Sequence, residues 1–194
     1  MIQSKPSEKR SALLATAWRL FYRDGYQRIG IDTLLAEAGV AKKTLYHHFT
    51  SKDNLIVALL EERATAILAE LDAQISRAGS KPETRFLAVF DWVSDWIKSR
   101  DFNGCAFMRA FSEFPAEEHP VHQAAWRFKA EIHRRLLSLA AECTVKRSAQ
   151  LADTAQLLIE GAIVVAHGSG RRDAASAAKR SIQDWLAGAT RLER

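Results

Sequence analysis

Apolar residues recur at helical spacing along most of the chain. Between residues 31 and 38, for example, Ile31, Leu34, Leu35 and Ala38 fall at i, i+3, i+4 and i+7, the spacing of one face of an α-helix. No segment of any length alternates between apolar and polar residues, as a half-buried strand would. The pattern therefore predicts an all-α protein of about nine helices.

Glycine, proline and capping residues mark the ends of these predicted helices. Thr50 and Asp53 have the spacing of a capping box, whereas Gly30 and Ala41 are weak N-caps for the two helices that follow them. The clearest break is the GSKP segment at residues 79–82. The predicted helices span about 7–24, 31–38, 42–49, 51–77, 83–100, 105–111, 121–142, 148–167 and 174–189.

We expect two domains. Residues 7–55 would form a three-helix head, and residues 56–194 would form a larger helical domain. The helix from about 51 to 77 has no internal glycine or proline. It is therefore long enough to connect the head to the domain that follows.

Residues 30–49 predict two short helices joined by a tight turn. Gly39 follows the last periodic residue of the first helix, where glycine commonly adopts a left-handed conformation. On the second helix, Leu45, His48 and Phe49 share one side, which we expect to pack. The opposite side carries Lys42, Lys43, Tyr46 and His47.

The polar side of this second helix suits nucleic acid. Lysine offers charge to phosphate, and tyrosine and histidine offer hydrogen bonds. In a helix-turn-helix, the second helix enters the major groove of DNA. The alternative from the residues alone is a solvated face on a small helical domain, because helix-turn-helix geometry also occurs as ordinary packing.

Charge is distributed unevenly. The formal net charge is +5. Residues 1–55 hold nine Lys and Arg against five Asp and Glu, a balance of +4, and the other 139 residues hold 19 against 18. The excess positive charge lies around the predicted helix-turn-helix, as a nucleic-acid footprint would require.

Residues 20–55 resemble the N-terminal DNA-binding domain of the TetR family of transcriptional regulators. The resemblance covers roughly the first third of the chain, and its residue types recur at the family's spacing. The matching residues are Phe21, Gly25, Tyr26, Ala38, Gly39, Val40, Thr44, Leu45, Tyr46, His48, Phe49, Ser51 and Lys52.

The resemblance implies a ligand-responsive regulator, most commonly a repressor, that binds a palindromic operator in double-stranded DNA as a homodimer. By the same resemblance, Lys42, Lys43 and Thr44 would contact base edges and the nearby backbone. Tyr46, His47 and Lys52 would contact phosphates. An effector would shift the spacing of the two heads through the long helix and weaken DNA binding.

Aromatic residues gather in the predicted C-terminal domain, where the family generally binds an effector. A pocket lined by them would suit a small apolar or aromatic molecule, whereas from spacing alone they are more simply core. The candidates for the pocket are Phe90, Trp92, Trp96, Phe107, Phe111, Trp126 and His133.

The last two predicted helices are strongly apolar, and the first of them is apolar nearly all round. A second copy of the chain would cover them in a two-fold, four-helix interface, although both helices could instead close the core of one subunit. The candidate interface residues are Leu158, Ile159, Ala162, Ile182, Trp185 and Leu186.

Other chemistry receives little support. Two cysteines are too few for a disulfide framework, and Cys105 has no cluster of cations near it in sequence to make it a redox sensor. Pro120 lies between His119 and His122 in a loop, which disfavours a metal site. We expect no metal, no cofactor and no enzymatic activity, because no catalytic motif is present.

The absence of an apolar stretch of about 18 residues and of a signal peptide predicts a cytoplasmic protein that contacts no membrane. Two rivals to the regulator remain. One is a small-molecule-binding helical module whose basic head is incidental, and the other is a helical enzyme. An enriched, symmetric DNA motif would separate the regulator from both.

Overall fold

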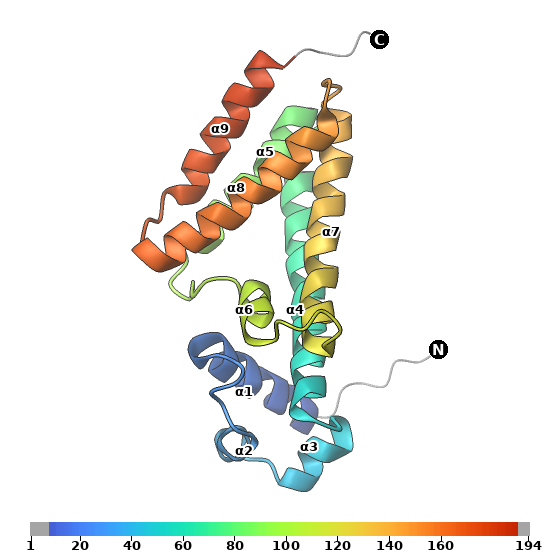
Figure 1. Cartoon of the computed structure of the whole chain (residues 1–194), viewed down its shortest axis with the longest axis vertical. Coiled ribbons are helices and arrows are strands. Elements are labelled where there is room, and N and C mark those ends of the chain that lie inside the picture. The colour runs from blue at the N-terminus through green and yellow to red at the C-terminus, as the bar shows by residue number, and fades with distance from the viewer. Residues whose placement is uncertain (1–7, 190–194) are drawn as a thin grey trace, which may run out of the picture. The chain divides into compact units, whose positions relative to one another are not determined.

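The computed structural model describes residues 8–189, which form nine α-helices and no strands (Figure 1). The predicted all-α fold class is confirmed. The predicted N-cap of the first helix, Ser7, lies outside the described residues. The helices are α1 (Glu8–Asp24), α2 (Ile31–Ala38), α3 (Lys42–His48), α4 (Lys52–Arg77), α5 (Pro82–Lys98), α6 (Ala106–Glu113), α7 (Pro120–Glu142), α8 (Ser148–Ser169) and α9 (Ala174–Gly188).

The described chain divides into two compact units. The first holds the residues up to Ala64 together with Ala106–Phe128, and the second holds Thr65–Cys105 together with the residues from Lys129 onward. The sequence predicted a single boundary after residue 55. The observed division differs because α4, with 26 residues, and α7, with 23, are each long enough to contribute to both units.

The first unit builds the helix-turn-helix as the sequence predicted. Leu34, Leu35, Leu45 and Phe49 are buried, so α2 and α3 share a core with α1. Gly39 ends α2 with φ of +63°, in the left-handed region. Neither α2 nor α3 has a side-chain hydrogen bond at its N-cap. Burial, rather than capping, therefore holds the two short helices in place.

The start of α4 is capped differently from the prediction. The Oγ atom of Ser51 accepts a hydrogen bond of 3.1 Å from the backbone N–H of Asn54. The Asn54 side chain also donates to the hydroxyl of Thr50. The predicted box of Thr50 and Asp53 thus lies one residue too early, because α4 begins at Lys52 and its cap is Ser51.

The second unit is organised around α5, α8 and α9. α8 and α9 lie side by side, and both pack against α5 (Figure 1). Ala152, Ala155 and Ile159 of α8 are buried, as are Ala178 and Ile182 of α9. The three alanines are small enough to allow the helices to approach closely, and the two isoleucines fill the space between them.

Among the described residues, α8 is the one helix long and apolar enough, by length and composition alone, to cross a membrane. The core helix of a soluble protein passes the same test. α8 packs against α5 and α9 on one side, and 39% of its most apolar window is buried.

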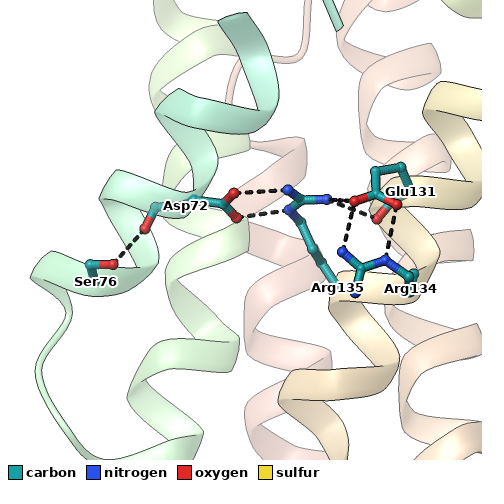
Figure 2. Close-up of polar contacts among 5 residues, drawn as sticks. All are labelled: Asp72, Ser76, Glu131, Arg134 and Arg135. Carbon is teal, nitrogen blue, oxygen red and sulfur yellow. Dashed lines mark hydrogen bonds and ion pairs between the residues drawn. The ribbon is translucent and has the colours of Figure 1, made fainter. Parts of the chain in front are cut away.

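A charged network joins α4 to α7 within the second unit. Arg135 of α7 donates to both carboxylate oxygens of Asp72 of α4, at 2.7 and 2.8 Å (Figure 2). The same guanidinium donates to Glu131, which also accepts a bidentate pair from Arg134. Hydrogen bonds from Arg134 and Arg135 lower the pKa of Glu131 to about 2. Hydrogen bonds to Asp72 are the largest cause that raises the pKa of Arg135.

Candidate nucleic-acid interface

The exposed side of α3 carries the side chains that the sequence assigned to DNA. Lys42, Lys43, Tyr46 and His47 are exposed, and Tyr46 retains 43% of its accessible area. Leu45, on the opposite side, is completely buried. α3 is therefore anchored by one side and presents two lysines, a phenol and an imidazole to its surroundings.

Lys42 is held only weakly within the protein. Its ammonium lies 3.9 Å from a carboxylate oxygen of Asp32, and both side chains are largely exposed. An exposed ion pair of this kind contributes about 0 to 1 kcal/mol, so an external phosphate can replace it at little cost. Thr44 is half-buried, which leaves it less available than the two lysines.

Lys52 differs from the other candidates because it is half-buried at the start of α4. Its ammonium lies 6.0 Å from the centre of the Phe21 ring. Burial lowers the pKa of Lys52, while the charges of Asp53 and Glu113 oppose that shift. The ammonium lies in the first turn of α4, where unpaired backbone N–H groups also favour an anion.

Three of the predicted pocket residues belong to the first unit, and their surroundings differ. Phe107 stacks on Phe128 with ring centres 3.8 Å apart, and Phe111 lies 4.7 Å from His122. Trp126 instead exposes 61% of its area. Phe107 is thus a buried core residue, whereas Trp126 is on the surface.

The other four predicted pocket residues belong to the second unit. Trp92 and Trp96 stack at 6.3 Å, and Trp96 contacts Phe102 at 5.1 Å. Phe90 is fully buried. His133 lies 3.4 Å from Asp153 through Nε2, and its buried Nδ1 has no hydrogen-bond partner among residues 8–189. The half-buried tryptophan pair is the part of this set that retains accessible aromatic surface.

The predicted dimer-interface residues differ in exposure. Ile159, Ala162, Ile182 and Leu186 are buried within their own chain and offer little surface to a second copy. The sequence pattern identified the stripe that packs α8 and α9 together and against α5. Leu158 and Trp185 are half-buried.

A different face of α8 is apolar and exposed. Leu157 exposes 74% of its area, Val164 51% and Val165 41%. Gly161 and Gly168 are exposed on the same helix, at positions i+4 and i+11 from Leu157. Their spacing forms one stripe along α8, which the sequence did not distinguish from the buried stripe because both are apolar.

Cys105 has a cationic neighbour that the sequence did not reveal. The Lys129 ammonium donates to Glu160 Oε1 at 2.5 Å, and it also hydrogen-bonds to the Cys105 sulfur. Burial lowers the pKa of Lys129, but the charges of Cys105 and Glu160 and the hydrogen bonds to them raise it overall. The two partners lie 24 and 31 residues from Lys129, so no short motif could have indicated the cluster. Cys143, by contrast, is buried and donates to the Leu139 carbonyl.

The two histidines that the sequence placed in a loop both engage protein groups, although His122 lies in the first turn of α7. His119 Nε2 lies 3.5 Å from Asp53, and His122 Nδ1 lies 2.9 Å from the Phe114 carbonyl. Across residues 8–189, no group of three or more His, Cys, Asp or Glu side chains is arranged to hold a metal ion.

Comparison with known proteins identifies the family. The family model described as bacterial regulatory proteins of the tetR family matches residues 13–59. The crystal structure of SCO4454, a TetR-family transcriptional regulator from Streptomyces coelicolor, superposes with a TM-score of 0.88 and 32% identity, covering 94% of this chain and 90% of that one.

Two curated relatives match over shorter lengths. The transcriptional activator FasR of Mycolicibacterium smegmatis is 32% identical over 91 residues, which are 47% of this chain and 41% of FasR. The transcriptional repressor NemR of Escherichia coli is 28% identical over 107 residues, 55% of this chain and 54% of NemR. The chain thus spans about half the length of these curated relatives.

The similarity to SCO4454, in contrast, extends over both units. It joins the helix-turn-helix match at the N-terminus to a shared helical architecture behind it. The chain belongs to the TetR family of helix-turn-helix transcriptional regulators, which are DNA-binding proteins and not enzymes.

Proposed function

We propose that the protein is a homodimeric, ligand-responsive repressor that binds a two-fold symmetric operator through the exposed side of α3. The observation that carries this proposal is the contrast between the two sides of that helix. Leu45 is buried in the first unit. Lys42, Lys43 and Tyr46 are exposed, and their side chains carry groups that can bind phosphates or base edges.

The candidate contacts divide by role. Lys42 and Lys43, at the start of α3, would reach base edges together with Thr44, because the N-terminal residues of a recognition helix enter the groove first. Tyr46, His47 and Lys52 would bind phosphates. Phosphate contacts fix the register of the protein on the duplex, whereas base contacts determine the sequence.

The homodimer would use the exposed stripe of Leu157, Val164 and Val165 on α8. Isolated apolar side chains on a surface are ordinary, but a continuous apolar stripe on one helix marks an interaction surface. A two-fold dimer carries two heads, and we propose that they occupy the two halves of one symmetric operator. Half-sites would then be separated by about 34 to 36 Å, one turn of B-DNA, or by a multiple of it.

The effector would be a small apolar or aromatic molecule bound in the C-terminal part of the chain. The tryptophan pair Trp92 and Trp96 supplies accessible aromatic surface there, and His133 supplies an unsatisfied polar atom. Binding of the effector would weaken DNA binding through α4. Such coupling is typically about 1 to 3 kcal/mol and is reciprocal, so operator DNA would weaken effector binding by the same factor.

Repression, rather than activation, is part of the proposal. NemR is named a repressor and FasR an activator, so the relatives allow both outcomes. Repression is the commoner outcome in the family. A reporter gene placed under the selected operator should be silenced by the intact protein and released by a bound effector.

Selection of duplexes from a random pool tests the central part of this proposal. The protein should enrich a motif with two-fold symmetry, and two chains should bind each selected duplex. Lack of any enriched motif would reject sequence-specific DNA binding and support the alternative of a helical module with an incidental basic head.

A further inference from the structure

The helix α6 lies close to α1 within the first unit (Figure 1), and polar contacts join it to the end of α1. The Arg109 guanidinium donates to the backbone carbonyls of Phe21, at 3.2 Å, and Tyr22, at 3.0 Å. Both carbonyls lie in the last turn of α1, where the helix dipole is negative, and the Phe21 carbonyl also accepts a hydrogen bond of 2.9 Å from the backbone N–H of Gly25. A cation at this position stabilises the end of α1.

Glu113, one turn further along α6, holds the connection between α1 and α2. Its Oε2 atom accepts a hydrogen bond of 2.6 Å from the backbone N–H of Gln27. Its Oε1 atom lies 2.8 Å from the position that a Cβ on Gly25 would occupy, and Gly25 has φ of +95°. The backbone conformation therefore favours glycine here, and a side chain at this position would displace the Glu113 carboxylate.

A third contact completes the attachment. The Tyr26 hydroxyl donates to the Ala106 carbonyl at 3.1 Å, and the centre of its ring lies 5.6 Å from that of Phe21 and 6.1 Å from that of Phe114. The start, middle and end of α6 thus all contact the same short segment, residues 21–27. α1 in turn packs against α2 and α3.

We propose that Arg109 and Glu113 are positioning residues for DNA binding. They fix the end of α1 and the following turn, and thereby hold α2 and α3 in the arrangement that binds the duplex, without contacting it themselves. This inference rests on the DNA-binding function proposed above. These contacts would raise the affinity for DNA by increasing the fraction of molecules in which α2 and α3 have the arrangement that binds DNA. The apparent Kd equals the intrinsic Kd divided by that fraction.

Glu113 offers a sharp test because electrostatics and positioning predict opposite results. Glu113→Ala and Glu113→Gln both remove one negative charge, which by itself would strengthen binding to DNA. Only Glu113→Gln retains an oxygen that can accept from Gln27. Positioning therefore predicts that Glu113→Ala weakens binding about tenfold while Glu113→Gln binds at least as tightly as the wild type.

The measurement is the Kd of the full-length protein for a selected operator duplex, corrected for the active fraction and made below each variant's unfolding midpoint. Arg109→Met should also weaken binding about tenfold, because it keeps the aliphatic bulk but removes both hydrogen bonds. Glu117→Ala, which removes an exposed carboxylate from the same unit, is the matched control and should not weaken binding. Base preference should stay unchanged in all variants.

Two results would overturn the inference. If Glu113→Ala and Arg109→Met unfold at lower temperature but retain the wild-type Kd, α6 only stabilises the fold. If Glu113→Ala binds as tightly as Glu113→Gln, the charge alone matters. Failure of the wild-type protein to bind any duplex would instead reject the proposed function, and the positioning inference with it.

Discussion

Two exposed helix faces in this protein have opposite chemistry. The exposed side of α3 carries Lys42, Lys43 and Tyr46, while the exposed stripe of α8 carries Leu157 and Val164. α3 is amphipathic, so its sequence alone shows which side packs. α8 is apolar nearly all round, so its sequence cannot show which side its own subunit covers. The difference teaches that periodicity assigns a surface only where the two sides of a helix differ in polarity.

The largest expected effect concerns α8. Val164→Glu places a charge in the centre of the exposed stripe and should give monomers, because burying an unpaired charge in the interface is unfavourable. Operator binding should fall by at least about 100-fold, since a dimer gains that factor or more from linking two heads. Sedimentation and operator titration provide the measurements.

Two further variants sharpen this comparison. Gln183→Glu adds the same charge at an exposed site of α9 outside the stripe and should remain dimeric. Ile159→Ala, on the buried stripe, should lower the free energy of unfolding by about 2 to 4 kcal/mol and leave the oligomeric state unchanged. A dimeric Val164→Glu protein would show that α8 does not form the interface through this face.

On α3, Lys43→Ala should relax the choice of base at one position of each half-site. The lost discrimination should be about 1 to 3 kcal/mol, the usual value of a direct base contact. Selection from a random pool with the variant would show one degenerate position. An unchanged sequence profile, with only weaker overall binding, would assign Lys43 to phosphate instead.

The network around Arg135 in the second unit should contribute less. Arg135→Gln should cost about 1 kcal/mol of unfolding free energy, because Asp72 and Glu131 are substantially exposed and solvent screens them. The pKa of Glu131 is about 2 in the folded protein and 4.5 in its ordinary state. Its stabilisation is therefore complete above pH 4.5 and is lost as the pH falls towards 2.

Urea unfolding of the wild type and Arg135→Gln between pH 2 and 7 tests this dependence. The difference in unfolding free energy should shrink on acidification through that range. A difference that stays constant with pH would mean that Arg135 stabilises α7 by packing rather than through the carboxylates.

The smallest effect should come from Lys52→Ala. Lys52 carries one charge and would contact one phosphate, and phosphate contacts carry no sequence information, so binding should weaken similarly for all DNA sequences. The slope of log K against log salt should fall in magnitude by about 0.9. Arg19, which is paired with Glu37, provides a control, and Arg19→Ala should leave that slope unchanged.

Much of the fold followed from the sequence because local signals determine it. Gly39 ends α2 as predicted, and α2, α4 and α7 lie within one or two residues of their expected bounds. The predicted boundary between domains differed from the observed units because it depends on contacts between distant segments. Such contacts are not encoded in the spacing of neighbouring residues.

In the candidate site, too, features set by neighbouring residues could be predicted from the sequence, and features set by contacts between distant residues could not. The exposed side of α3 could be predicted because the polar and apolar residues separate at helical spacing. The attachment of Arg109 to the end of α1 could not, since the donor and its acceptors are 87 and 88 residues apart. The same limit applies to Lys129 beside Cys105, and to the choice between the two apolar stripes of α8.

Lysine footprinting by mass spectrometry, with and without a selected operator duplex, tests most directly whether α3 contacts DNA. The duplex should protect Lys42 and Lys43 from acylation and leave the exposed Lys146 of the second unit as reactive as before. Protection at Lys146 with continued modification of Lys42 and Lys43 would contradict the account, because DNA would then bind a different surface of the protein.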